Sequence, residues 1–276
     1  MLTDRHQCNV YEAAYTGVEE RFPFPDPKIL DGWVPPSGAR ILSVGAGAGR
    51  DLWHLTELAG VHAVDFATSG LSIARRHGIQ AVRTDVTRGL PYRDRSFDLV
   101  ILKDILEHLV APDALAREAG RVVRPDGRVI ISVPNHFYLP FRLRLLLGKG
   151  LIWKSVGHDH TAVFDDWNYM HLRFFTFRGF RRFLDAVGLV PERFFWDFGT
   201  LAHYNQPEML LGAQLEKRRL AIPLSRRGRF AVAVLRPLYG AFSALLPRRL
   251  RHAIVSIAPG LLCAGFYVRC RLDAAR

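Results

Sequence analysis

The chain has 276 residues, 49% of them hydrophobic and 23% charged, so it can bury a large core and disorder is not expected. Its three cysteines, Cys8, Cys263 and Cys270, form neither a disulfide framework nor a zinc pattern, which predicts a reducing compartment, the cytoplasm. No stretch reaches the roughly 18 uninterrupted apolar residues that a membrane-spanning helix needs.

The net charge of +12 is concentrated in the second half of the chain. Residues 1–135 carry 16 Lys and Arg against 17 Asp and Glu, a balance of −1, whereas residues 136–276 carry 22 against 9, a balance of +13. A basic surface could meet nucleic acid, anionic lipid headgroups or an anionic substrate, and charge alone does not choose among them.

Short apolar runs alternate with helical patterns in the first half. We expect a helix from about Asp51, a second that Ser69 caps, and a third over 113–123, with a turn at 124–127. The strands are expected at residues 41–44, 61–65, 80–84, 97–102 and 128–133. This alternation predicts an α/β fold, a doubly wound and mostly parallel sheet with helices on both faces.

Three glycines, Gly45, Gly47 and Gly49, directly follow the first strand. Glycine lacks the Cβ that would keep a ligand off the backbone, and a helix start presents unpaired N–H groups. In such sheets the ligand lies at the carboxyl ends of the strands, so this turn is predicted to hold one.

Two carboxylates end the next strands. Asp65 lies twenty residues after Gly45, where it could accept both hydroxyls of a ribose, and Asp85 could accept from an adenine amino group. Alternatively, either aspartate caps the turn that follows it. A dinucleotide site would prefer glycine where this chain has Arg50.

An ordered set of motifs between residues 40 and 135 resembles the class I S-adenosylmethionine-dependent methyltransferases, in the small-molecule branch that includes the ubiquinone-biosynthesis O-methyltransferases. The motifs are Ile41-Leu-Ser-Val-Gly-Ala-Gly-Ala-Gly49, Val64-Asp65, Thr84-Asp85, Ser96-Phe-Asp-Leu-Val100 with Leu106-Glu-His108, and Arg124-Pro-Asp-Gly127 leading to Ser132-Val-Pro-Asn135.

The resemblance implies S-adenosylmethionine as cofactor. It places the cofactor contacts at Gly45, Ala46, Gly47, Asp65, Phe66, Asp85, Val86 and Lys103. One departure is Ser43, where the family usually has an acidic residue. A sulfonium is already activated, so methyl transfer needs mainly alignment, and a hydroxyl acceptor also needs a base.

Three histidines are candidates for that base: His171, in a stretch that resembles an acceptor-side motif of the family, His136 and His108. Asp104, Glu107 and His108 also resemble a metal-supporting pattern, and their spacing would put them on one helical face. We favour the alternative, a Glu-His pair that packs beside the site without a metal.

The resemblance extends the sheet to seven strands. Val190–Phe198 resembles strand six, and Ala264–Leu272 resembles an antiparallel strand seven. We expect a methyltransferase core at 1–198 plus 263–276, with a cofactor half at 38–135 and a lid at 136–172, and a helical basic insertion at 199–262. The insertion is either a solvated cap or an interfacial surface for anionic membrane, and nucleic acid is not favoured.

The sequence therefore predicts methyl transfer to a small-molecule or lipid- or sugar-linked acceptor, at a hydroxyl oxygen. The alternative is a catalytically silent methyltransferase-fold protein that binds or scaffolds at a membrane surface. The expected location is the cytoplasm, with peripheral membrane association if the insertion is interfacial.

Overall fold

The computed structural model describes residues 36–148, 150, 171–195 and 248–274, together with Glu12 and Ile29. Of these, residues 36–133, 171–195 and 267–274 belong to one compact unit, and residues 134–148, 150 and 248–266 belong to a second. Most of the expected lid and of the expected basic insertion lies outside the described residues. Among the described helices, none combines the length and the apolar character that crossing a bilayer requires.

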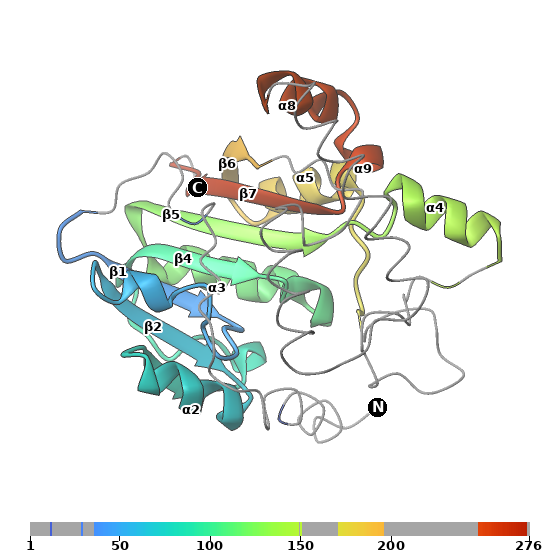
Figure 1. The fold of residues 1–276 in the computed structure, drawn as a ribbon. Coiled ribbons are helices and arrows are strands. Elements are labelled where there is room, and N and C mark those ends of the chain that lie inside the picture. Colours follow the sequence, from blue (N-terminus) through green and yellow to red (C-terminus); the bar gives the residue numbers. More distant parts are fainter. Residues whose placement is uncertain are drawn as a thin grey trace. The chain divides into compact units, whose positions relative to one another are not determined.

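Seven strands form one sheet in the order β3-β2-β1-β4-β5-β7-β6 (Figure 1). The first five run parallel wherever they pair, and β6 and β7 pair antiparallel, so the expected α/β fold is confirmed. The strands are β1 (Arg40–Val44), β2 (Gly60–Asp65), β3 (Gln80–Arg83), β4 (Phe97–Lys103), β5 (Val123–Pro134), β6 (Leu189–Phe194) and β7 (Gly265–Leu272).

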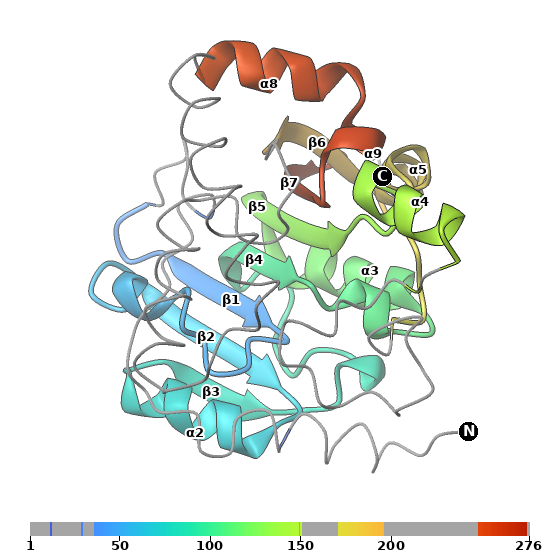
Figure 2. The ribbon, with the colours of Figure 1, turned by 45° about the vertical axis from the view of Figure 1, so that its right-hand side comes forward.

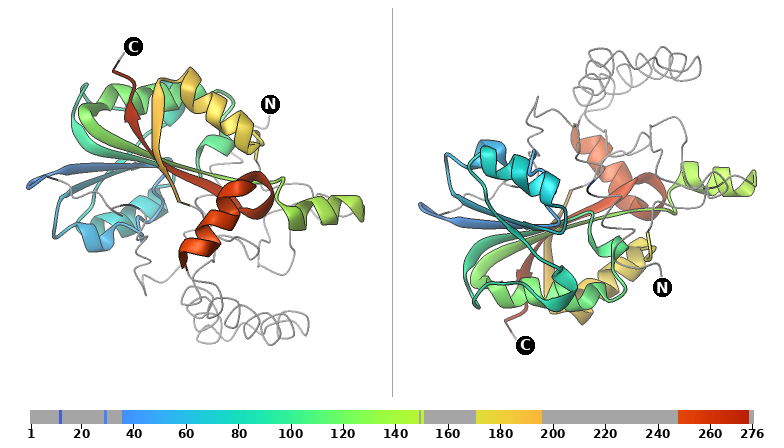
Figure 3. Two further views of the ribbon diagram at one scale, coloured as in Figure 1. Left: turned by 90° about the horizontal axis from the view of Figure 1, so that it is seen from above. Right: turned by 90° about the horizontal axis from the view of Figure 1, so that it is seen from below.

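Helices cover both faces of this sheet. Helix α2 (Thr68–Arg76) lies on one face, whereas α3 (Pro112–Val122) and α5 (Phe177–Ala186) lie on the other (Figure 3). The central strands are therefore buried on both sides, which explains their continuous apolar runs. Side chains with no exposed surface fill this core, among them Ile41, Leu42, Leu99, Ile101 and Ile130.

The other described helical elements are 3-10 turns and α-helices. Three 3-10 turns, η1 (Trp53–Leu55), η2 (Val86–Arg88) and η3 (Leu106–His108), belong to the first unit. The second unit contains α4 (Leu139–Leu146), α8 (Arg248–Ile257) and α9 (Pro259–Leu262).

The expected helix after the glycine turn is wrong. Successive i to i+3 hydrogen bonds fold this segment into tight turns, with Leu52 N–H donating to the Gly49 carbonyl at 2.9 Å and Leu55 N–H to the Leu52 carbonyl at 2.8 Å. The apolar spacing that suggested a helix instead buries Leu52, Trp53 and Leu55 from these turns. A turn of three residues offers no helix N-terminus to a ligand.

The expected turn at 124–127 lies inside β5 as a bulge. Phe97 of β4 pairs with Val123, and two residues later Leu99 pairs with Arg128. Asp98, 5% exposed, faces this bulge and accepts hydrogen bonds from the Arg40 backbone, at 2.7 Å, and from the Arg124 guanidinium. One buried carboxylate thus joins β1, β4 and β5 at a point where the ladder is interrupted.

The expected cap of α2 is also wrong. Its N-cap residue is Ala67, whose side chain cannot cap, and Ser69 lies inside the helix. The carboxylate of Glu12 instead accepts the free N–H groups of Thr68, at 2.6 Å, and Ser69, at 2.9 Å. Hydrogen bonds from Ser69 and then Thr68 lower the pKa of Glu12 to about 2.

Replacing Glu12 by Ala is expected to lower the free energy of unfolding by about 0.5–2 kcal/mol, the usual effect of losing a cap. Because the folded-state pKa is depressed, this contribution is complete above the unfolded pKa of about 4.3 and disappears as the pH falls towards 2. Urea titrations of both proteins at pH 7 and pH 3 measure it. If the two proteins differ in free energy of unfolding by the same amount at both pH values, Glu12 does not act as this cap.

Helix α2 packs closely against the glycine turn at Gly70. A Cβ at this position would lie 2.8 Å from the carbonyl carbon of Gly47, which is backbone and cannot rotate away. Gly120 in α3 is a matched helical glycine with more room, since its Cβ would meet Leu272 Cδ2 at 3.5 Å.

Replacing Gly70 by Ala is therefore expected to destabilise the fold by roughly 1–3 kcal/mol through overpacking. Replacing Gly120 by Ala should leave stability unchanged or raise it by up to about 1 kcal/mol, because alanine favours helix. Thermal unfolding of the two variants beside wild type makes the comparison, and equal effects would contradict the close packing.

Candidate functional site

The glycine turn begins at the carboxyl end of β1, on the sheet edge where β2 and β4 also end (Figure 2). Gly45, Gly47 and Gly49 have φ angles of 69°, 52° and 64°, in the left-handed region that favours glycine. The N–H groups of Gly45 and Ala46 donate to the Val64 carbonyl at 2.8 and 3.3 Å. This turn is therefore fixed against β2.

Asp65 closes the turn from the end of β2. One carboxylate oxygen accepts the Gly47 N–H at 2.7 Å, and the other accepts the N–H groups of Phe66 and Ala67 at 2.7 and 2.8 Å. The side chain is only half-buried, and a carboxylate has about four acceptor sites. It can therefore hold the turn and still accept a hydroxyl of a ligand.

Asp85 caps the turn that follows it, which is the alternative role that the sequence left open for this residue. It is the N-cap of η2 and accepts Thr87 Oγ1 at 2.6 Å and Thr87 N–H at 3.0 Å. These bonds, the hydroxyl first, lower its pKa, and Arg88 lies 3.3 Å away. The carboxyl is 40% exposed, so capping leaves part of it open to a ligand.

Lys103 ends β4 and pairs with Asp51, Nζ to Oδ2 at 2.9 Å. Asp51, two residues after Gly49, was missed from the sequence, although an acid directly beyond the glycine turn is a signal that could have found it. Ile105 approaches the turn so closely that a Cβ on Gly45 would lie 2.6 Å from its Cδ1. The segment after β4 therefore adjoins the turn.

A second group of polar side chains, Glu107, His108 and His171, follows this segment. The Nε2 atoms of His108 and His171 lie 3.8 and 3.9 Å from Glu107 Oε1, and the two imidazole rings are 4.7 Å apart. Leu172 and Arg173 donate their N–H groups to the Glu107 carbonyl at 2.7 and 3.0 Å. These two bonds bring His171 beside η3.

Glu107 is the buried member of this cluster, with 1% of its surface exposed. Burial raises the pKa of Glu107 well above its usual range, and the nearby Asp104 carboxylate raises it further. One ligand atom from each cluster residue lies within 4.8 Å of the others, so the cluster could hold a divalent ion or exchange protons.

The expected single helical face for Asp104, Glu107 and His108 is wrong. Asp104 has a left-handed φ of 51° and precedes η3, and its carboxylate accepts the hydroxyl of buried Ser132 at 2.9 Å. His171 takes the expected place of Asp104 in the cluster. His136 is buried and stacks with Phe141 in the second unit.

Comparison with known proteins gives residues 42–131 as a match to a family described as "Methyltransferase domain". The chain is 31% identical over 121 residues to a ubiquinone biosynthesis O-methyltransferase of Xylella fastidiosa, covering 41% of this chain and 49% of that one. It is also 31% identical over 134 residues to a demethylmenaquinone methyltransferase of Tropheryma whipplei, covering 46% and 56%. The chain thus spans about half the length of these relatives.

Solved structures share the fold at low identity. Phosphoethanolamine N-methyltransferase 2 of Haemonchus contortus, in complex with S-adenosyl-L-methionine, aligns with a TM-score of 0.54 at 15% identity, over 97% of this chain and 57% of that one. The [4+2]-cyclase SpnF aligns with a TM-score of 0.54 at 16% identity, over 96% and 92%. Residues 42–131 of this chain are therefore similar to a methyltransferase domain, and the seven-stranded fold is shared with the solved structures.

Proposed function

We propose that the protein transfers a methyl group from S-adenosylmethionine to a hydroxyl oxygen of a small-molecule or lipid-linked acceptor. The observation that carries the proposal is the pairing of Asp65 with the Gly47 N–H at the carboxyl ends of β1 and β2. The matched relatives support a quinone-type acceptor by their names, each over about half of its length.

The residues at this edge fit the methyl donor. Gly45, Ala46 and Gly47 would lie along its methionine part, Asp65 and Phe66 at the ribose, and Asp85 and Val86 at the adenine. Both carboxylates keep free acceptor sites, as a nucleoside's hydroxyl and amino groups require. Lys103, paired with Asp51, would lie beside the methionine end.

S-adenosylmethionine supplies an activated methyl on a sulfonium, so the protein's task is to align the acceptor oxygen with it. A hydroxyl acceptor must also lose its proton. We assign the removal of that proton to His171. Its side chain is 13% exposed, and its Nε2 atom lies 3.9 Å from Glu107 Oε1. Glu107 would act as a positioning residue, because its carboxyl is buried away from solvent.

Replacing Asp65 by Ala is expected to weaken binding of S-adenosylmethionine and S-adenosylhomocysteine by roughly 10- to 100-fold, since charge-assisted hydrogen bonds contribute about 1.5–3 kcal/mol. Isothermal calorimetry measures the affinity. Asp126→Ala removes an exposed carboxylate from the β5 bulge and should bind like wild type. If wild type binds neither compound, the proposed function is wrong.

Replacing His171 by Gln is expected to lower methyl transfer by about 10²- to 10⁴-fold, as for loss of a general base, while cofactor affinity stays unchanged. The assay follows labelled methyl from S-adenosylmethionine into demethylated quinone precursors and lipid extracts. His54→Gln, at an exposed histidine in η1, is the matched control.

The same assay separates a base from a metal site. Activity should survive treatment with EDTA if His171 acts as a base. Loss of activity that Mg²⁺ or Zn²⁺ restores would instead assign Glu107, His108 and His171 to a metal ion. Cofactor binding without any turnover would favour the catalytically silent alternative.

A further inference from the structure

Helix α5 carries three exposed arginines on a strongly amphipathic sequence. Phe180 and Leu184 are buried on the side that faces the sheet, whereas Arg178, Arg181 and Arg182 are exposed. Arg178 lies three residues before Arg181 and four before Arg182, so it neighbours both on the helix surface.

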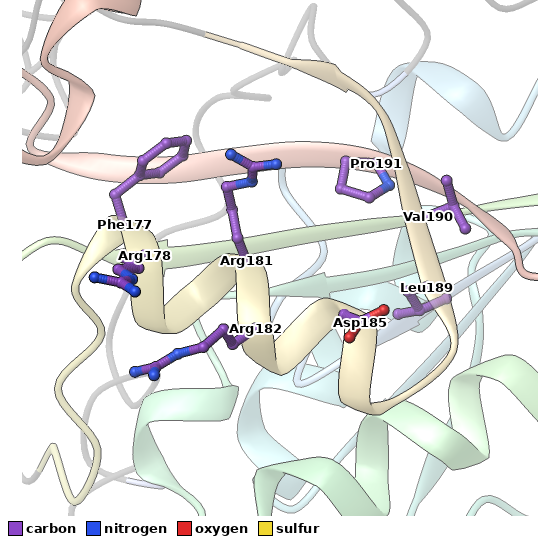
Figure 4. Close-up of a pocket in the computed structure, with 8 residues that line it drawn as sticks. All are labelled: Phe177, Arg178, Arg181, Arg182, Asp185, Leu189, Val190 and Pro191. Carbon is purple, nitrogen blue, oxygen red and sulfur yellow. The ribbon is translucent and has the colours of Figure 1, made fainter.

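These arginines line a pocket between α5 and the start of β6, with a volume of about 470 Å³. Figure 4 shows Arg181 extending between Phe177 and Pro191, whereas Arg178 and Arg182 extend towards the other side of the helix. Leu189 and Val190 complete the apolar lining, and Asp185 is its acidic member. The pocket therefore combines apolar walls with a net positive charge, and its size is typical of small-molecule sites.

The pocket arginines differ from others in the same unit. Arg121 pairs with Glu118 and Asp94, and Arg128 pairs with Glu192. None of the three pocket guanidinium groups makes a hydrogen bond or an ion pair to any residue that the structure describes. Glu192, the acid that follows Pro191, already lies within 4 Å of both Arg128 and Arg269.

The pocket is separate from the methyl-donor edge. It adjoins β6, at one side of the sheet, and β4, β5 and β7 lie between β6 and β1 in the strand order. All its lining residues belong to the first unit. A ligand bound there would not compete with a ligand on the glycine turn.

We propose that this pocket binds the phosphate group of a ligand that also carries an apolar part. Guanidinium forks match phosphate oxygens in pairs, and Arg181 is the fork that lies between the apolar walls. Phe177 and Pro191 would contact the apolar part, and Arg178 and Arg182 add positive charge around it. The phosphate could belong to a soluble ester or to a lipid headgroup, and both have this chemistry.

The test titrates the intact protein with inorganic phosphate, with phenyl phosphate and with vesicles of phosphatidylcholine with or without phosphatidylglycerol, at constant ionic strength. Phenyl phosphate should bind more tightly than inorganic phosphate. Arg181→Ala should weaken binding about tenfold or more, Arg178→Ala and Arg182→Ala less. Arg117→Ala, an exposed arginine on α3, should bind like wild type. Thermal unfolding verifies that each variant is folded.

Binding of phenyl phosphate that Arg181→Ala weakens would support a soluble ester as ligand. Binding only to phosphatidylglycerol vesicles, with the same dependence on Arg181, would support a lipid phosphate. No saturable binding in either arm, or binding that Arg181→Ala leaves unchanged, would overturn the proposal. S-adenosylmethionine affinity, measured in parallel, should be unaffected by these variants, so failure here is distinct from failure of the proposed function.

Discussion

The glycine turn, which is the proposed methyl-donor site, depends on the carboxylate of Asp65. It receives three backbone N–H groups, one from the glycine turn and two from the start of the next segment. The pairing register of β1 and β2 makes this contact possible. Val44, the last residue of β1, pairs with Val64, so the glycine turn and Asp65 lie side by side at the ends of the two strands. Shifting β2 by one residue would turn Asp65 towards the opposite face and leave the Gly47 N–H without this acceptor.

Close packing on two sides holds the same turn in place. Gly70 of α2 touches it at Gly47, and Ile105, beyond β4, touches it at Gly45, each where a Cβ would lie closer than 3 Å to its neighbour. The contact of Gly70 with backbone requires glycine for reasons of space, whereas at Gly45 the Ile105 side chain would have to move. Gly45 and Gly47 also have the φ angles that favour glycine. The glycines therefore shape the protein's own packing as much as they make room for a ligand.

Features encoded by local patterns could be predicted from the sequence. Apolar runs predicted β1 to β5 and α3, whereas β6 and β7 were expected from the family resemblance. At the start of α5, Thr176 Oγ1 accepts the Gly179 N–H at 3.0 Å, which is local cap chemistry of the same kind. The features that the sequence did not predict depend on residues that are distant along the chain. Glu12 caps α2 from 56 residues away. Asp104 has a backbone conformation outside the helical region, and its carboxylate accepts a hydrogen bond from Ser132 on the neighbouring strand. Apolar spacing alone could not distinguish the tight turns after Gly49 from a helix.

The proposed acceptor side, the cluster of Glu107, His108 and His171, is built on a different principle from the proposed donor side. Its cluster joins η3 to a segment 63 residues later, through the hydrogen bonds that Leu172 and Arg173 donate to the Glu107 carbonyl. Because backbone groups make this connection, the side chain at position 171 can change without breaking it. The glycine turn, the proposed donor site, is thus held by backbone packing, whereas the cluster proposed for the acceptor side depends on side chains that can change.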